Sequence, residues 1–446
     1  MTNSDYLVIC NYVLPLEISS KELYINRRKE KKKGGCMSHL EVNVPVLPGD
    51  GSAPEQMAPA STIAIKAAEL DGIKIKFIKV PGGWRDFKEY EDTFPEVTRQ
   101  IVSEQKPPLW FFGGVGTKAL DKAEGFGGTY PKMRPEGRCL LTSRDMWNLL
   151  INERPAIFYP ELRSISRVAD IANGRTKIPE GGIRVLILRY LLQGEYFGNS
   201  YFSARLPYRI RQRMGLKLKD EVTGYEPIIS NIDYLTHESV EKFLRYAFAR
   251  ARELKMRLIC VAKANVLPTH QYFWLNAQHI HKEEFPDVEL REVVYSDDGM
   301  RLLAHPELLH GVVACTNKDG DMLSDGILEN VGSMGLMYSS AINPETGAAM
   351  FESGSGTFPE AEGKNIANPI GRILSGGLML EHICKTRNLG ASNGAIALEK
   401  AVHSVLRDGY RTPDLYQEGI DDPKKRVGTR EMGQVILSYL EKYKIS

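Results

Sequence analysis

Short apolar runs alternate with longer amphipathic segments along this chain, and that alternation constrains the fold more than any other feature of the sequence. The segment "LEVNVPVLPGDG" places Val42, Val44 and Val46 at the two-residue spacing of a strand, and glycines then interrupt it. The segment "PPLWFFGGVG" repeats the form, with an apolar run before a glycine turn. The runs "GIRVLILRYL" and "MRLICVAK" have the continuous apolar character of buried strands.

Helical patterns separate these predicted strands. Pro54 stands at a favourable first helical position before "EQMAPASTIAIKAAEL". Residues 237–255 carry apolar side chains at helical intervals, namely Val240, Phe243, Leu244, Ala247, Ala251 and Leu254. Strands that alternate with helices over 446 residues predict an α/β protein of two domains or one large unit.

The basic charge of the chain is concentrated near its N-terminus. The formal net charge is +2, and residues 1–36 hold seven Lys/Arg against four Asp/Glu, which leaves a slightly acidic body. We predict that residues 1–36 are a disordered basic extension and that the folded protein begins near Met37. A nucleic-acid-binding function would depend on residues 27–33 alone, so we expect no nucleic-acid partner.

Cysteine usage and hydropathy bear on the cellular compartment. The six cysteines are scattered without a C-x-x-C pair, which argues against a disulfide framework or a zinc ribbon and fits a reducing compartment. No apolar run approaches the length of a membrane span, and the N-terminal extension lacks the apolar core of a signal peptide. We expect a cytoplasmic protein with no membrane partner.

Two glycine-rich loops could in principle hold phosphate groups. The segments "GGVGTK" and "GSGTFPEAEGK" match neither the G-x-x-x-x-G-K-[ST] pattern nor G-x-G-x-x-G after a strand. The sequence therefore predicts neither a P-loop nor a Rossmann fingerprint, and any nucleotide must bind through another kind of loop.

Three aspartates, Asp319, Asp321 and Asp325, crowd the segment "NKDGDMLSDGILE". The segment lacks the glycine and glutamate of an EF-hand loop. Asp319 and Asp321 could simply favour the start of a helix. However, Asp321 and Asp325 are four residues apart, so on a helix they share one face and repel each other. A divalent cation would turn that cost into coordination, and carboxylates suit Mg²⁺ or Mn²⁺.

Several segments together resemble the β-decarboxylating dehydrogenases, which include 3-isopropylmalate, isocitrate, homoisocitrate and tartrate dehydrogenases. The matching segments run in family order: "VPVLPGDGSAPEQM", "LILRYLLQGEYFG", "AKANVL", "GDMLSD", "ESGSGTFPEAEGKNIANPIGRILSGGLMLEH", "GYRTPDL" and "VGTREMG". Each match is weak alone, but the ordered set is specific. Its motif character is closest to 3-isopropylmalate dehydrogenase.

The resemblance implies a two-domain α/β fold with a large mixed sheet and a cofactor loop unlike the Rossmann turn. Residues 37–149 and 332–446 would form a first, cofactor-binding domain. Residues 150–331 would form a second domain that binds substrate and builds a homodimer. The active-site cleft would lie between the domains and would be completed by the partner subunit.

The resemblance also implies which side chains bind and convert the substrate, a malate with a substituent at C3. Three arginines match those that hold its carboxylates: Arg144, Arg154 and Arg189. Asp321 and Asp325 match the metal carboxylates, and Asp297 matches a third that the partner subunit supplies. Lys263, also from the partner, would take the 2-hydroxyl proton, and Tyr196 would protonate the enol.

Residues of the glycine-rich loop would bind the nicotinamide cofactor, which takes hydride from C2. The matching positions are Glu352, Gly356, Glu360 and Asn368. An acid at position 360 would hold the ribose hydroxyls and repel the 2′-phosphate of NADP, so the sequence favours NAD. Ser355 stands where many members carry histidine, which bears on cofactor affinity.

The C3 substituent is predicted to be apolar. Leu140 and Leu141 match the leucine pair that 3-isopropylmalate enzymes place before the first arginine, and Val266 is also their choice. Isocitrate-type enzymes carry polar residues there instead. Two alternatives remain open: a polar substrate such as isocitrate, homoisocitrate or tartrate, and a catalytically inactive regulatory subunit. Asp319 replaces an apolar residue of the family, and the sequence indicates no role for it beyond a turn or a cap.

Overall fold

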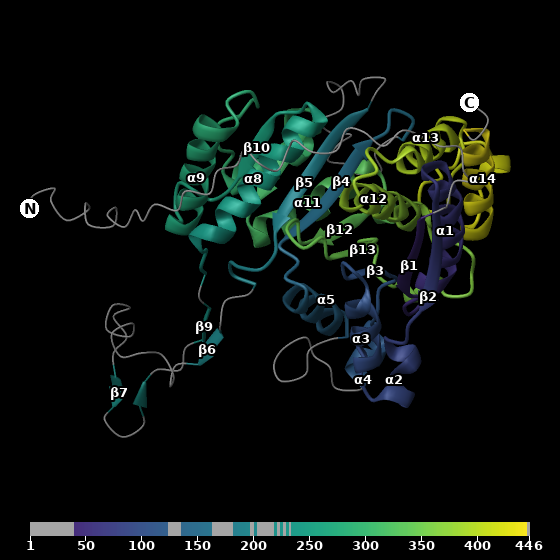
Figure 1. Ribbon diagram of the computed structural model, residues 1–446, viewed down its shortest axis with the longest axis horizontal. Helices are drawn as coiled ribbons and strands as arrows, with labels where there is room; N and C mark the ends of the chain where they lie inside the picture. Colours follow the sequence, from purple (N-terminus) through teal and green to yellow (C-terminus); the bar gives the residue numbers. More distant parts are fainter. Residues whose placement is uncertain are drawn as a thin grey trace, which may run out of the picture. The chain divides into compact units, whose positions relative to one another are not determined.

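One mixed sheet of nine strands organises this computed structural model, in the order β10-β11-β5-β4-β12-β13-β3-β1-β2 (Figure 1). The structure describes residues 40–123, 135–162, 182–196, 200–202, 218–220, 224–225, 229–231 and 233–443, all within the unit His39–Ser446. The strands of the sheet are β1 (Leu40–Leu47), β2 (Ile73–Lys79), β3 (Leu109–Phe112), β4 (Ile151–Phe158), β5 (Ile183–Tyr190), β10 (Leu258–Val261), β11 (Gly311–Cys315), β12 (Ser339–Ile342) and β13 (Ala349–Glu352).

The strands change direction near the middle of the sheet. β4 runs antiparallel to both β5 and β12, and β12 runs antiparallel to β13, whereas the other neighbours are parallel. The predicted α/β class with a large mixed sheet is therefore confirmed. The four strands from residues 150–331 lie on one side of the β4–β12 contact and the other five lie on the other side. The division into two domains stays a prediction, because the sheet is continuous across that contact.

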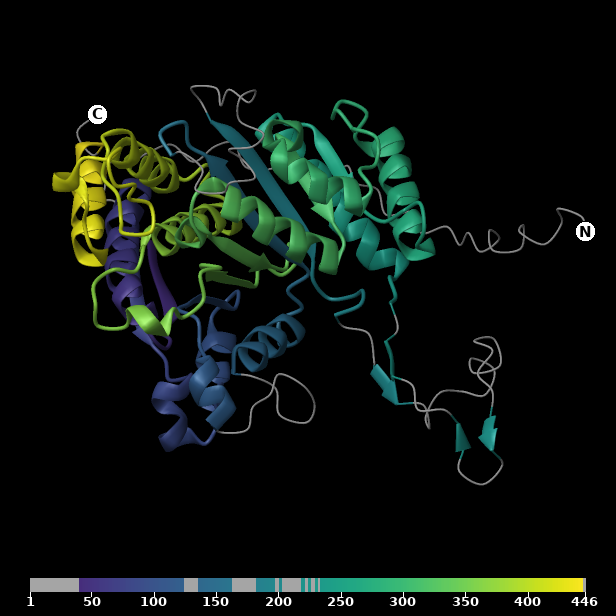
Figure 2. The same cartoon turned by 180° about the vertical axis from the view of Figure 1, so that it is seen from behind.

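Helices cover both faces of the sheet (Figures 1 and 2). α1, α12, α13 and α14 pack against one another, and α8 packs beside α9. The helices are α1 (Ala53–Ala68), α2 (Trp84–Tyr90), α3 (Glu96–Glu104), α4 (Lys118–Ala123), α5 (Pro135–Met146), α8 (His237–Leu254), α9 (Pro268–Glu284), α10 (Ser296–Arg301), α11 (Asn317–Val331), α12 (Ile370–Thr386), α13 (Asn393–Arg407) and α14 (Thr429–Lys442).

The alternation of side chains along β5 assigns α11 and α8 to opposite faces of the sheet. Arg189 bonds to Asp321 of α11, whereas the ring of the next residue, Tyr190, lies 5.4 Å from that of Phe243 in α8. Successive residues of a strand point to opposite faces. We call the α11 side the front face and the α8 side the back face.

The segments with the clearest sequence patterns form the strand and the helices that were predicted for them. Val42, Val44 and Val46 are buried in β1, and Pro54 lies in the first turn of α1. In α8 the spaced apolar residues are buried, except that Leu254 at its C-terminal end is 40% exposed. These segments were predictable because burial of one face requires the observed periodicity.

Two small antiparallel sheets lie outside the nine-stranded sheet. β6 (Ser200–Phe202) pairs with β9 (Ile229–Asn231), and β7 (Leu218–Asp220) pairs with β8 (Gly224–Tyr225), both antiparallel. Among the helices of the described residues, none has the length and apolar character needed to cross a membrane. The predicted basic extension, residues 1–36, lies outside the described residues.

Candidate active site

A cleft of about 950 Å³ opens on the front face, near the ends of β3, β5 and β13 and beside α5 and α11. It brings together nine predicted site residues from distant parts of the chain: Leu140, Arg144, Arg154, Arg189, Asp321, Asp325, Glu352, Gly356 and Glu360. Six others do not line it: Leu141, Tyr196, Lys263, Val266, Asp297 and Asn368. The cleft thus joins the predicted substrate arginines, two predicted metal ligands and most of the predicted cofactor loop.

The central strands place charged side chains in adjacent positions. Ser340 pairs with Glu153, and Ser339 pairs with Glu352, so Arg154 and Glu352 lie in one row on either side of Ser339. Arg189 lies on β5, and its strand partner is Asn152. Because residues two apart on a strand share a face, the guanidiniums of both strands project toward the cleft.

Helix α11 meets these arginines directly. Arg189 donates from Nη1 to Asp321 Oδ1 and from Nε to Asn317 Oδ1, the latter at 2.8 Å. Arg154 donates from Nη1 to Asp325 Oδ1 at 3.0 Å and to Ser324 Oγ at 2.7 Å. The two aspartates therefore lie one helical turn apart and face the same two arginines.

Close approach of α11 to β5 depends on Gly320. A Cβ atom at this position would lie 2.9 Å from Arg189 Cβ and 3.1 Å from Cys315 Cβ. Real side chains do not tolerate such contacts between packed carbons, so a larger residue would push the helix away from the strand. The missing side chain lets the carboxylate of Asp321 reach Arg189.

The three arginines are buried close to one another at the cleft, so their charges repel. Burial lowers the pKa of Arg189, and the charges of Arg154 and Arg144 lower it further. Burial likewise lowers the pKa of Arg144, whose Nε is buried and has no hydrogen-bond partner among the described residues. A buried guanidinium nitrogen without a hydrogen-bond partner carries a free-energy cost that an anion can remove. This arrangement suits a ligand with more than one carboxylate.

Asp321 and Asp325 could hold a divalent cation. Burial raises the pKa of Asp325, and the charge of Asp321 adds to that effect against the opposing influence of Arg154. A cation between the two carboxylates would relieve this repulsion, and oxygen ligands suit Mg²⁺ or Mn²⁺. Within the described ranges no group of three His, Cys, Asp or Glu side chains is placed to hold a metal ion. This chain therefore offers two carboxylates, and substrate oxygens or another chain would have to complete the coordination.

Lys263 and Asp297 lie together but outside the cleft of their own chain. Lys263 follows β10, Asp297 lies in the first turn of α10, and their side chains form an ion pair. Lys263 lowers the pKa of Asp297. The structure thus brings these two predicted residues to each other and not to Asp321.

Tyr196 adjoins the cleft without lining it. Its hydroxyl donates to Asp321 Oδ2 at 3.2 Å, and the guanidinium carbon of Arg189 lies 5.5 Å from the centre of its ring. Partial burial raises the pKa of Tyr196, and Asp321 raises it further, so the hydroxyl keeps its proton. Tyr196 thus lies beside a predicted metal ligand, and its role as a proton donor stays a prediction.

The remaining predicted residues are more dispersed. Asn368 donates to Asp414 Oδ2 at 3.0 Å and accepts from the backbone N–H of Ile370 at the start of α12. Val266 is 65% exposed, and Leu141 is half-buried. Only Leu140, of the three predicted pocket residues for the C3 substituent, reaches this chain's cleft.

Two buried side chains that hold the cleft were missed from the sequence. Arg372 of α12 is fully buried and donates to the carbonyl oxygen of Gly356 at 2.8 Å, which fixes the glycine-rich loop. Asp50 accepts from the backbone N–H groups of Gly116 and Trp84 at 2.7 and 3.0 Å. The one available signal was a lone arginine within the apolar, glycine-rich stretch "NPIGRILSGG".

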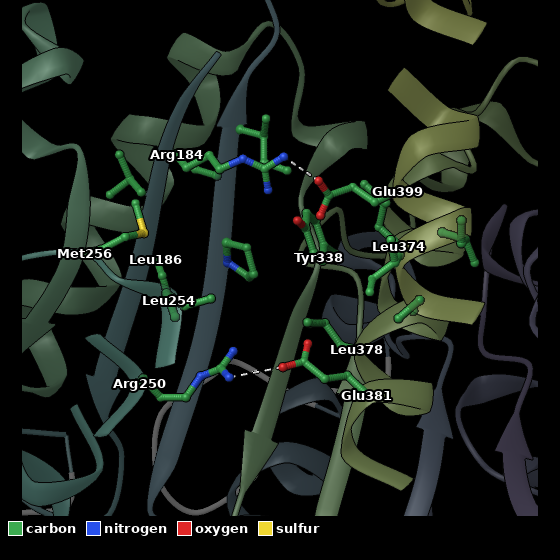
Figure 3. Close-up of a pocket in the computed structure, with 18 residues that line it drawn as sticks. Arg184, Leu186, Arg250, Leu254, Met256, Tyr338, Leu374, Leu378, Glu381 and Glu399 are labelled. Atoms are coloured by element: carbon green, nitrogen blue, oxygen red, sulfur yellow. Dashed lines mark hydrogen bonds and ion pairs between the residues drawn. The ribbon is translucent and has the colours of Figure 1, made fainter. Parts of the chain in front are cut away.

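A smaller cavity of about 190 Å³ lies on the back face, between α8 and the helices α12 and α13 (Figure 3). Two ion pairs span it, Arg184–Glu399 at 2.5 Å and Arg250–Glu381 at 3.1 Å. Its arginines are already paired with carboxylates, so it lacks the unsatisfied charge of the front cleft.

Known proteins are similar to this chain over most of its length. The isocitrate/isopropylmalate dehydrogenase family model matches residues 43–436. The chain is 32% identical over 400 residues to 3-isopropylmalate dehydrogenase from Clostridium pasteurianum, with 90% of this chain and 99% of that one covered. It is 31% identical over 400 residues to 3-isopropylmalate dehydrogenase from Thermotoga maritima, again covering 90% and 99%. Isocitrate dehydrogenase from Methylococcus capsulatus is similar in structure, with a TM-score of 0.67, 26% identity, and 89% of this chain and 99% of that one covered.

Proposed function

Because this chain belongs to the isocitrate/isopropylmalate dehydrogenase family of decarboxylating dehydrogenases, we propose that it converts a 3-substituted malate to a 2-oxo acid and CO₂, with NAD and Mg²⁺ or Mn²⁺. The observation that carries this proposal is the crowding of Arg144, Arg154 and Arg189 opposite Asp321 and Asp325. Three buried guanidiniums favour a substrate with at least two carboxylates, and the paired aspartates favour a cation beside them.

The side chains divide the chemistry between binding and proton transfer. The arginines would hold the substrate carboxylates by two-pronged hydrogen bonds and orient C2 and C3. Lys263 of a second copy would accept the proton of the 2-hydroxyl, and Tyr196 would give its proton to C3 after CO₂ leaves. NAD would accept hydride from C2, and the cation would polarise the carbonyl oxygen formed there and stabilise the charge left by decarboxylation.

The position of Lys263 supports a shared site in a homodimer. Lys263 and Asp297 pair with each other outside the cleft of their own chain, although the proposed chemistry needs both beside Asp321. A second copy could supply them through a symmetric interface, in which each chain lends the same residues to the other. The cytoplasmic location remains an expectation from the cysteine usage.

Leu140 supports an apolar C3 substituent, since it lines the cleft four residues before Arg144. Glu360 lines the same cleft and favours NAD over NADP, because its charge would repel a 2′-phosphate. The exposed Lys118 also lines the cleft, and its ammonium could bind a third carboxylate. A substrate of the isocitrate type is therefore the alternative.

The decisive experiment is a panel of 3-substituted malates, including 3-isopropylmalate, isocitrate, homoisocitrate and tartrate. Each is supplied with NAD or NADP and Mn²⁺, and the absorbance of the reduced cofactor is followed. We expect turnover with NAD on an apolar 3-substituted malate. Preference for isocitrate would contradict the role of Leu140, and no turnover with Mn²⁺ bound would favour an inactive regulatory subunit.

The metal site has its own test. Asp325→Asn should abolish Mn²⁺-dependent turnover while the protein stays folded, because a neutral amide oxygen binds a divalent cation much more weakly than a carboxylate does. Glu329→Gln, one turn further along α11 on an exposed side chain, is the matched control and should retain activity. Equal activity of wild type and Asp325→Asn would remove Asp325 from the site.

A further inference from the structure

Asp319, the aspartate without a role in the proposed reaction, is buried behind the cleft. It lies in the first turn of α11 and is only 5% exposed. Its Oδ2 accepts from the hydroxyl of Ser296 at 2.6 Å and from that of Thr316 at 3.4 Å. The same oxygen lies 3.4 Å from Nδ1 of His270 in a packing contact without a hydrogen bond, because this nitrogen accepts from the backbone of Lys263 and has no proton to donate. Asp319 therefore contacts the first turns of both α9 and α10.

These contacts connect Asp319 to Lys263 and Asp297, the two predicted site residues that lie outside the cleft of their own chain. Ser296 immediately precedes Asp297 in α10. His270, 4% exposed in α9, accepts the backbone N–H of Lys263 on Nδ1 at 2.8 Å. Only a neutral imidazole can accept at this nitrogen, and burial lowers the pKa of His270, which keeps the ring neutral.

We propose that Asp319 and His270 are positioning residues that hold Lys263 and Asp297 in the geometry needed by the neighbouring subunit. This inference rests on the proposed function, since it assigns the two residues to a shared site. Asp321 lies two residues from Asp319 and faces its own chain's cleft. A single turn of α11 therefore carries both residues. Asp321 would bind the cation in the site of its own chain, and Asp319 would support the residues that contribute to the site of the neighbouring subunit.

A carboxylate is suited to this place because it only accepts hydrogen bonds. The hydroxyls of Ser296 and Thr316 both point to it, and an apolar residue would leave both without an acceptor. A second carboxylate supports α9, the helix that carries His270, since Asp233 Oδ2 accepts from Thr269 Oγ1 at 2.6 Å. The start of α9 is thus held from both sides of His270.

The test compares Asp319→Leu, Asp319→Asn and a matched control. Asp71 accepts the hydroxyl of Ser392 at 2.6 Å, as Asp319 accepts that of Ser296, but it caps α13, which does not line the cleft. Asp71→Leu therefore removes the same kind of bond at another place. For each variant, kcat and KM are measured, together with the labelling rate of Lys263 by trinitrobenzenesulfonate, followed by peptide mass spectrometry.

We expect Asp319→Leu to lower kcat by about 10- to 100-fold, the range seen when support behind an active residue is lost. KM for malate and NAD should change little, because the arginines and the glycine-rich loop are untouched. Lys263 should label several-fold faster, because Asp297 no longer holds its Nζ. Asp319→Asn should keep most of the activity, since its amide oxygen still accepts from Ser296. Asp71→Leu should lower stability without changing kcat or the labelling of Lys263.

Unchanged kcat and unchanged labelling in Asp319→Leu would overturn the proposal, as would equal losses of kcat in the leucine and asparagine variants. If Asp319→Leu does not fold, Ser296→Ala removes the donor of the same bond with a smaller change in volume, and faster labelling of Lys263 is expected there too. The labelling needs no substrate. Faster labelling in a protein that oxidises no malate would therefore sustain the positioning role and reject the proposed function.

Discussion

The two faces of strands β4 and β5 use arginine in opposite ways. On the front face, burial lowers the pKa of Arg144 and of Arg189, and the charge of Arg154 lowers both further. On the back face, burial alone would lower the pKa of Arg250, but Glu153 and the neighbouring acids outweigh it and the pKa is raised. The pKa of Arg184 is raised in the same way by Glu399.

This difference distinguishes arginines whose charge is available to a ligand from arginines whose charge stabilises the fold. Arg250 contacts three carboxylates of the chain itself, Glu153 at 3.1 Å, Glu253 at 2.8 Å and Glu381 at 3.1 Å. Arg144 makes no such ion pair among the described residues. Mutations on the front should therefore change activity more than stability, and mutations on the back should do the reverse.

The largest expected effect is on the front face. Arg189→Met should lower kcat/KM for the malate substrate by about a thousandfold, because a desolvated ion pair is worth about 4 kcal/mol. The free energy of unfolding should change little, because the lost bonds to Asp321 and Asn317 are offset by the lost repulsion from Arg154 and Arg144. Steady-state kinetics and urea unfolding measure the two quantities. Strong destabilisation with normal kinetics of the folded fraction would show that Arg189 serves the fold and not the substrate.

The next effect is on the back face. Arg250→Met should lower the free energy of unfolding by about 3–5 kcal/mol, because it leaves Glu153 and its neighbours buried without a cation. kcat/KM of the folded enzyme should change less than threefold. Urea unfolding with kinetics on the same preparation tests both. A large loss of kcat/KM in a protein of normal stability would show that the back face also serves the reaction.

The stability of the back face should depend on pH through the charge state of Glu381. Burial raises the pKa of Glu381 above its ordinary 4.5, and Arg250 does not restore it because Glu153 and Glu253 share that arginine. A raised folded pKa means that protonation favours the folded state, so Glu381 contributes stability at low pH that is lost as pH rises through the folded pKa. The free energy of unfolding of wild type should therefore rise relative to that of Glu381→Gln as pH falls from 7 to 5. Movement the other way would mean that Arg250 holds Glu381 ionised.

The smallest effect concerns the second back-face pair. The side chains of Arg184 and Glu399 are 48% and 36% exposed, so solvent and salt screen their attraction. Arg184→Met should cost less than about 1 kcal/mol of stability, and less still at high salt. Urea unfolding at low and high ionic strength measures this. A cost as large as that of Arg250→Met would remove the distinction between the buried and the exposed pair.

Sequence and structure agree most where local patterns determine the element. The alternating valines of β1 and the helical spacing in α8 predicted both elements, because burial of one face imposes a period on the sequence. The front cleft was predicted through ordered motifs, and nine of the fifteen named residues line it. The roles of all fifteen stay predictions until they are measured.

Long-range pairing could not be predicted from the sequence. Glu153 and Arg250 belong to a strand and a helix far apart in the chain, and nothing in their local segments shows that they meet. The same holds for Arg372 and the carbonyl of Gly356, and for Asp319 and Ser296. These contacts depend on how elements stack in three dimensions, whereas periodicity reports only which side of each element is buried.

Gly320 lies between Asp319 and Asp321 and lets α11 rest against Arg189. A methyl group at that position would act as a wedge that lifts both neighbours together. One neighbour faces the chain's own cleft, and in the proposed homodimer the other would support residues that contribute to the site of the second copy. In the proposed homodimer, a change of a single hydrogen atom for a methyl group is therefore the smallest alteration that should misalign two active sites at once, one in each subunit.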